Sequence, residues 1–166
     1  MCTRAALNRR QLLGLLPGLA AATALAGPLG ACGSHDTGPE PVRWGQENCA
    51  YCGMIIDDPH FAAEIRSPDG KLSKFDDIGC AAMFLAPRKW AADPHTEFWA
   101  GDNELGTWLD GRQAWYLAGA KTPMNYGFAA YATKRPGALT FTEFRQAVAA
   151  KGSSSRCDHA TNHGST

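Results

Sequence analysis

The stretch of residues 60–92, HFAAEIRSPDGKLSKFDDIGCAAMFLAPRKWAA, changes its pattern of apolar residues partway along. The first part predicts two strands joined at Asp69-Gly70, where glycine adopts a positive φ at low cost. The second part spaces its apolar residues three and four apart, which predicts a helix with Asp76 or Asp77 as N-cap. A strand pair followed by a helix indicates an α+β fold, with small antiparallel sheets covered by helices.

Short apolar segments on both sides of this stretch extend the sheet. Residues 52–57, CGMIID, predict a short strand before it, and residues 96–102, TEFWAGD, predict a strand after it. Residues 107–119, TWLDGRQAWYLAG, predict a hairpin-like strand pair around Asp110-Gly111.

The last part of the chain predicts one more strand and a second helix. Residues 126–134, YGFAAYATK, have the aromatic and alternating pattern of a strand. Residues 139–151, LTFTEFRQAVAAK, predict a helix that begins with a capping box, Thr140-x-x-Glu143. The second half of the chain thus loosely repeats the first.

The loose repeat is clearest around two methionines. Met54 precedes Phe-Ala-Ala-Glu at residues 61–64, and Met124 precedes Phe-Ala-Ala-Tyr at residues 128–131. We interpret residues 48–102 and 103–150 as two loosely related units. In such a pair the two methionines would lie near a pseudo-twofold axis.

The first thirty-one residues have the features of a bacterial export signal. Three arginines precede a long apolar run that ends in Leu29-Gly30-Ala31-Cys32, the pattern of a lipobox. We expect Cys32 to be lipidated and to anchor the mature chain to a membrane. Arg9-Arg10 also fits a twin-arginine signal, and an ordinary basic leader remains an equal alternative.

Composition divides the mature chain into three parts. Residues 32–47 are rich in Gly, Pro and charge and predict a flexible tether, residues 48–150 predict the folded domain, and residues 151–166 predict a disordered tail. Removal of the leader leaves 13 basic and 16 acidic side chains. This balance gives no electrostatic reason to expect nucleic acid as a partner.

Cys49 and Cys52 form a C-x₂-C motif that has several interpretations. A redox dithiol normally precedes a long helix, whereas the sequence after Cys52 favours a strand and a turn. A zinc site needs two further ligands, and no second C-x₂-C or H-x₃₋₅-H lies within the domain. The residues available for that role are Cys80, Cys157, His60, His95, His159 and His163. A disulfide between Cys49 and Cys52 is also open in an exported protein.

A soft metal ion is the fourth interpretation. Thiolates and thioethers select Cu(I), and an extended Cys52-Gly53-Met54 segment would place one of each on the same side of a strand. Met124 would close the site from the second half. Met83 and Cys80 lie in the helix pattern and are each expected to be buried core residues.

The ordered set of motifs resembles the NosL family of copper-binding lipoproteins. The resemblance rests on the lipobox, on Cys-x-x-Cys-Gly-Met-Ile-Ile at residues 49–56, on Phe-Asp-Asp-Ile-Gly-Cys at residues 75–80, and on Pro-Met-Asn-Tyr-Gly at residues 123–127. It covers residues 49–131. The fold that it implies is two related small ββαβ units.

The resemblance implies a lipid-anchored copper chaperone on the periplasmic side of a bacterial membrane, with no catalytic turnover. Such a protein would bind Cu(I) and deliver it for assembly of the copper centres of nitrous oxide reductase, beside a membrane transporter complex. The ligands carried over are Cys52, Met54 and Met124. Cys49 is added although family members differ at that position, and His60 is the candidate for a histidine ligand.

Two other functions remain open from the sequence. A thiol-disulfide oxidoreductase would act through Cys49 and Cys52. A structural adaptor would dock to the transporter complex without carrying metal. At the C-terminus, Cys157, His159 and His163 would either form an auxiliary scavenging site or be chance residues of a polar tail.

Overall fold

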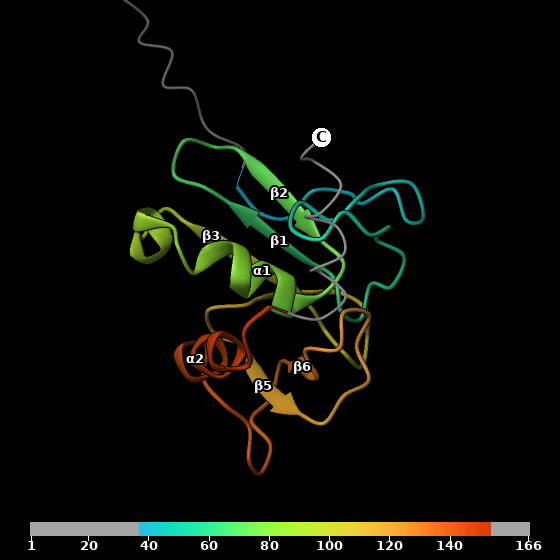
Figure 1. The fold of residues 1–166 in the computed structure, drawn as a ribbon, viewed down its shortest axis with the longest axis vertical. Helices are drawn as coiled ribbons and strands as arrows, with labels where there is room; N and C mark the ends of the chain where they lie inside the picture. The colour runs from blue at the N-terminus through green and yellow to red at the C-terminus, as the bar shows by residue number, and fades with distance from the viewer. Residues whose placement is uncertain (1–36, 154–166) are drawn as a thin grey trace, which may run out of the picture. The chain divides into compact units, whose positions relative to one another are not determined.

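Four short strands form the larger of the two sheets in the computed structural model, which describes residues 37–153 (Figure 1). They are β1 (Ala63–Arg66), β2 (Leu72–Phe75), β3 (Glu97–Gly101) and β4 (Trp108–Asp110). The strands are antiparallel and lie in the order β2-β1-β3-β4. The turn between β1 and β2 contains Asp69-Gly70, as the sequence predicts.

The helix α1 (Ile78–Leu85) packs against β1 and β2. Asp77 is its N-cap and accepts a hydrogen bond from the backbone N–H of Gly79. The predicted apolar face is buried and contains Ile78, Ala81, Ala82 and Leu85. A 3₁₀ turn, η1 (Lys89–Ala92), follows α1 and leads to β3.

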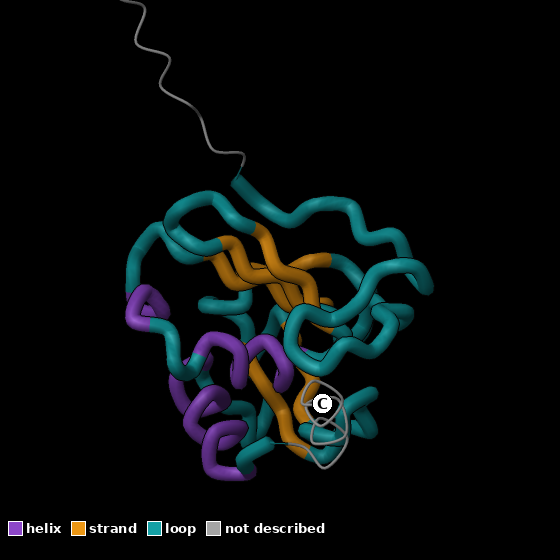
Figure 2. The backbone as a smooth tube through the Cα atoms, turned by 45° about the horizontal axis from the view of Figure 1, so that its top comes forward, coloured by secondary structure: helices purple, strands orange, loops and turns teal. Residues whose placement is uncertain are grey.

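The second sheet has two antiparallel strands, β5 (Trp115–Ala118) and β6 (Phe128–Tyr131), and is followed by the helix α2 (Phe141–Lys151). The predicted capping box between Thr140 and Glu143 is present in full. α2 packs against β5 and against α1, so the two helices lie side by side (Figure 2). Within this half of the core the rings of Tyr116 and Phe144 stack with their centroids 4.0 Å apart. The observed fold is α+β with small antiparallel sheets.

The two strands of residues 107–119 do not pair with each other, contrary to the hairpin prediction. β4 pairs with β3, and β5 pairs with β6. The chain turns at Gly111, whose backbone N–H donates to the carbonyl of Phe98, 2.7 Å away, and this bond holds the turn on β3. The order ββαβ therefore appears in the first half, whereas the second half runs β4-β5-β6-α2.

Residues 52–57 form a turn and an isolated bridge instead of the predicted strand. Gly53 has φ 76°, and the backbone N–H of Cys49 donates to the carbonyl of Met54 at 2.7 Å. The single bridge joins Asn48 and Ile55. A positive φ in the middle of the segment reverses the chain, because an extended strand requires a negative φ at every residue.

The described part of the predicted tether, residues 37–47, is bound to the sheet. Arg66 donates to the carbonyl of Gly38 at 2.9 Å, and Lys74 donates to the carbonyl of Pro41 at 2.8 Å. These side chains alternate with the residues that face α1, so the segment lies over the opposite face of the sheet. The composition of residues 37–47 gave no reason to expect contact with the folded domain. Charged side chains of the strands nevertheless donate hydrogen bonds to the backbone of this segment. Residues 1–36 and 154–166, including Cys32 and the C-terminal Cys157, lie outside the described residues.

Within residues 37–153 no helix is both long enough and apolar enough to cross a membrane.

Candidate metal centre

Four buried side chains meet where the C-x₂-C turn lies against the start of α1. They are Cys49, Cys52, Asp76 and Cys80, and one potential ligand atom from each lies within 4.8 Å of all the others. All three cysteines are free thiols. We call this group the Cys3Asp cluster.

Backbone hydrogen bonds orient the two cysteines of the turn. Gly53 donates to the carbonyl of Cys49 at 3.0 Å, which closes the turn, and Ala50 donates to the carbonyl of Lys74 at 2.8 Å, which ties the turn to β2. Because Lys74 comes two residues before Asp76, this bond sets the turn beside the end of β2. Both thiols are consequently directed into the protein and are at most 4% exposed.

The other two members come from the junction of β2 and α1. Asp76 follows the last residue of β2, and Cys80 lies four residues later in the first turn of the helix. Asp76 lies outside the helix, just before its N-cap Asp77, and the junction between strand and helix brings its carboxyl group to the Cys80 thiol. Gly79 allows this junction to pack closely, because a Cβ atom there would lie 2.1 Å from the ring of Tyr126.

Contacts among the four groups shift their pKa values in opposite directions, down for Cys49 and up for Cys52, Asp76 and Cys80. Burial and the neighbouring Cys49 together raise the pKa of Asp76 to about 7. Cys52 Sγ donates to Asp76 Oδ1 at 3.3 Å. Hydrogen bonds from Cys52 and Cys80 lower the pKa of Cys49, and the interaction with Cys49 raises the pKa of each of the other two thiols. A bound cation would displace these protons, since metal ions bind thiolates and carboxylates in their ionised forms.

An open groove lies directly beside the cluster. Its lining consists of Gly53, Met54, Ile55, Asp57, Asp58, Asp76, Pro123 and Met124. Asp76 thus belongs to both the groove and the Cys3Asp cluster. Met54 is 54% exposed whereas Met124 is 1% exposed, so one thioether projects into solvent and the other is packed in the wall. We call this feature the methionine groove.

Asp77 holds the Met124 loop in place. Its Oδ2 accepts from the Thr122 hydroxyl at 2.6 Å and from the backbone N–H of Met124 at 3.0 Å, while its Oδ1 caps α1 through Gly79. One buried carboxylate therefore fixes both the start of the helix and the distant loop. The groove wall and the cluster are connected through adjacent residues, Asp76 and Asp77.

The sequence-predicted ligands are divided between these two places. Cys49 and Cys52 lie in the cluster, and Met54 and Met124 line the groove. Cys52 and Met54 do not share a strand face as predicted, because the turn at Gly53 directs one side chain inward and the other outward. His60 is outside the cluster; its Nδ1 lies 2.9 Å from Asp58 Oδ1 at the edge of the groove.

Sequence reasoning did not select two members of the cluster. Cys80 was named among the possible zinc ligands but was expected to be a buried core residue, and Asp76 was considered only as a helix cap. The available signal was the spacing Asp76-x₃-Cys80 at a helix start, combined with a separate C-x₂-C motif. Tertiary contact between these segments could not be read from either spacing.

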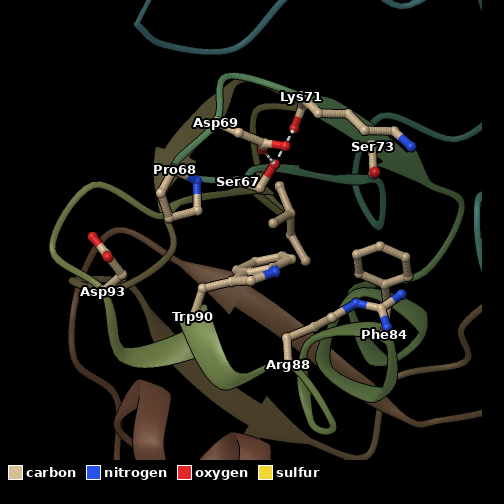
Figure 3. Close-up of a pocket in the computed structure, with 10 residues that line it drawn as sticks. Ser67, Pro68, Asp69, Lys71, Ser73, Phe84, Arg88, Trp90 and Asp93 are labelled. Carbon is tan, nitrogen blue, oxygen red and sulfur yellow. Dashed lines mark hydrogen bonds between the residues drawn. The ribbon is translucent and has the colours of Figure 1, made fainter.

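A second hollow lies away from this site, between the β1–β2 hairpin and η1 (Figure 3). Trp90, Phe84 and Arg88 form one side of it, and the Arg88 guanidinium lies 4.3 Å from the centre of the Phe84 ring. Its lining contains no cysteine, methionine or histidine. It does not contribute ligands for a soft metal.

Comparisons with known proteins identify one informative likeness. No family model matches the chain, and no curated protein matches it in sequence. The fold is similar to the crystal structure of the copper chaperone NosL from Shewanella denitrificans, with a TM-score of 0.51 and 17% sequence identity. The matched region covers 65% of this chain and 86% of that one. At this identity the likeness establishes a NosL-like fold.

Proposed function

We propose that this protein is a Cu(I) chaperone that binds copper through the Cys3Asp cluster and passes it to a partner protein. The observation that carries the proposal is the convergence of three buried thiols and one carboxyl group within 4.8 Å, in a chain with the fold of a copper chaperone. Cu(I) is the preferred ion because thiolate and thioether ligands favour soft cations. Zn(II) is the alternative ion for a site of three thiolates and one carboxylate.

The arrangement of the site supports transfer rather than permanent storage. Buried thiols retain the ion, since solvent and small ligands reach them poorly. The methionine groove leads to the same point through Asp76, so a partner's ligands have a route to the ion. Met54 and Met124 are suitable for a transient contact, because neutral thioethers bind Cu(I) more weakly than thiolates do.

The cellular setting belongs to the same proposal. The sequence resemblance to the NosL family and the likeness to a solved copper chaperone support delivery of Cu(I) for the copper centres of nitrous oxide reductase. The lipobox supports a lipid anchor at Cys32 on the periplasmic side of a membrane, close to a transporter complex that participates in assembly. The proposed activity is binding and transfer, without catalytic turnover.

The geometry disfavours a thiol-disulfide oxidoreductase. A catalytic dithiol needs an accessible nucleophilic thiolate, usually at a helix N-terminus, whereas Cys49 and Cys52 are both buried and are followed by a turn. A purely structural adaptor leaves the convergence of three thiols without a role. Neither alternative uses Cys80, which the structure places beside the other two thiols.

Anaerobic titration with Cu(I) in competition with a chromophoric chelator tests the proposal. We expect one ion per chain, bound in the full-length mature protein and in a variant in which Cys157, His159 and His163 are replaced by Ser. Loss of stoichiometric binding in that variant would assign copper to the C-terminus and overturn the proposal. A parallel competition with Zn(II) decides the metal, and Cu(I) must be retained when Zn(II) is in excess.

A further inference from the structure

The described residues contain four exposed large hydrophobic side chains, and three of them lie on two adjoining turns. These three are Trp44, Met54 and Ile55, and the fourth is Leu105. The two turns are joined by backbone hydrogen bonds, from Gly45 to the carbonyl of Ile56 at 2.8 Å and from Ile56 to the carbonyl of Glu47 at 2.9 Å. We call Trp44, Met54 and Ile55 the apolar patch.

The apolar patch lies at the methionine groove. Met54 and Ile55 line the groove directly, and Trp44 is exposed on the neighbouring turn that is bonded to theirs. Met54 and Ile55 are each more than half exposed. Exposed apolar side chains that gather in one place commonly mark an interaction site, whereas single ones need no explanation.

The charged side chains that line the methionine groove beside the apolar patch are all acidic. The groove is lined by Asp57, Asp58 and Asp76, and its lining contains no basic side chain. On the other turn, Arg43 is paired with Glu47 through Nε and Oε1 at 3.0 Å. A partner that covers this surface would therefore combine an apolar contact area with basic residues opposite the aspartates.

We propose that the apolar patch is the docking surface for the copper-accepting protein, which presents an apolar face with a basic rim. This inference rests on the proposed function. Copper transfer by ligand exchange requires the partner's ligands to reach the ion, and Asp76 is the member of the Cys3Asp cluster that lines the groove. A partner seated on the patch would place its own ligands over the groove.

A membrane surface is the other apolar environment available to an anchored protein. Anionic lipid attracts basic residues around an apolar face, whereas the residues beside Met54 and Ile55 are Asp57 and Asp58. The charge of the groove thus favours a protein over a lipid surface.

Parallel transfer experiments with two acceptors test the inference. The Cu(I)-loaded mature protein is mixed with copper-free nitrous oxide reductase, or with a small chelator that needs no docking surface. We expect Trp44→Ser and Ile55→Ser each to slow transfer to the reductase by about tenfold, within the range for truncation of an interface anchor. For Trp44→Ser, which lies outside the groove lining, transfer to the chelator and the affinity for Cu(I) should not change. Leu105→Ser is the matched control because it removes an exposed large hydrophobic side chain outside the patch.

Three other outcomes would each contradict a specific claim. Equal rates for the patch variants and the wild type with the reductase would overturn the docking surface but leave the chaperone function intact. Absence of transfer from the wild type to the reductase would contradict the proposed function itself. If the variants instead bind less to anionic vesicles while transfer to the reductase is unchanged, the patch contacts membrane and the inference is wrong. Asp57→Asn with Asp58→Asn should also reduce the dependence of the transfer rate on salt.

Discussion

The Cys3Asp cluster and the methionine groove are neighbours that share Asp76 but differ in almost every physical property. The cluster is buried, and its members come from two segments, the C-x₂-C turn and the junction of β2 with α1. The groove is open, and one of its two thioethers projects into solvent. Under the proposed function this difference would divide the work: the cluster would set how tightly copper is held, and the groove would set how readily it is exchanged.

Removal of a cluster thiol should have the largest effect on binding. Cys80→Ser should weaken Cu(I) affinity by more than about a hundredfold, since even the loss of a group that supports a ligand costs ten- to hundredfold. Competition with a chelator under anaerobic conditions measures this change. The matched control is Ala82→Ser, which adds a hydroxyl to the same buried helix without removing a ligand. Equal affinities for Cys80→Ser and the wild type would remove Cys80 from the site.

Loss of the carboxylate that connects the two regions should reduce stability. Asp77→Ala removes the cap of α1 and leaves the buried Thr122 hydroxyl and Met124 N–H without their acceptor, so we expect a loss of about 2 kcal/mol in the free energy of unfolding. Denaturant unfolding of the metal-free protein measures it. Thr140→Ala removes the cap of α2 and should cost about 1 kcal/mol. Asp77→Ala should also change the rate of copper exchange, whereas Thr140→Ala should not. If both variants changed this rate equally, Asp77 would not connect the cluster with the groove.

Changes in the groove should affect rate more than affinity. Met54→Leu should weaken Cu(I) binding by about tenfold at most, equivalent to about 1.4 kcal/mol, while the rate of transfer to a chelator falls. Stopped-flow mixing separates the two quantities. Met83→Leu is the control, since Met83 packs against the core on α1. If Met54→Leu weakened affinity as strongly as Cys80→Ser, the division between retention and exchange would be wrong.

The smallest effect lies outside both regions and concerns Glu64, a buried carboxyl group on β1. Burial raises its pKa, so its contribution to stability is fully present below the ordinary carboxyl pKa and is lost as pH rises through the raised value. Glu64→Gln should therefore be more stable than the wild type by about 1 kcal/mol near neutral pH and should have a flatter pH profile.

Urea denaturation over a series of pH values measures this difference. Glu143 is the control of opposite sign, because hydrogen bonds from Thr140 lower its pKa and its contribution is lost as pH falls. Glu143→Gln should accordingly be less stable than the wild type near neutral pH, and this difference in stability should disappear at acidic pH. If the free energy of unfolding depended more steeply on pH for Glu64→Gln than for the wild type, burial of Glu64 would not oppose its ionisation.

Local sequence patterns were sufficient to predict most helices, strands and caps, but they did not predict which strands pair. Asp69-Gly70, the Asp77 cap and the Thr140 capping box are each defined by neighbouring residues, and all three are present in the structure. The pairing of β4 with β3 and of β5 with β6 depends on tertiary packing around Gly111, which no local pattern specifies.

The candidate site shows the same limit. The C-x₂-C motif predicted Cys49 and Cys52 as candidate ligands, whereas Cys80 was one of six possible zinc ligands and its apolar helical spacing favoured a core residue. The strand expected for residues 52–57 failed because the positive φ of Gly53 is a property of the turn and not of the apolar pattern. Only the folded structure shows that the C-x₂-C turn lies close to the helix that carries Cys80.

X-ray absorption at the copper edge, applied to the Cu(I)-loaded mature protein and to Cys80→Ser, tests the central claim most directly. For the wild type we predict a first shell dominated by sulfur, with the sulfur contribution reduced in the variant. A shell that contains a histidine nitrogen, or one that is unchanged by Cys80→Ser, would contradict a copper site built on the Cys3Asp cluster.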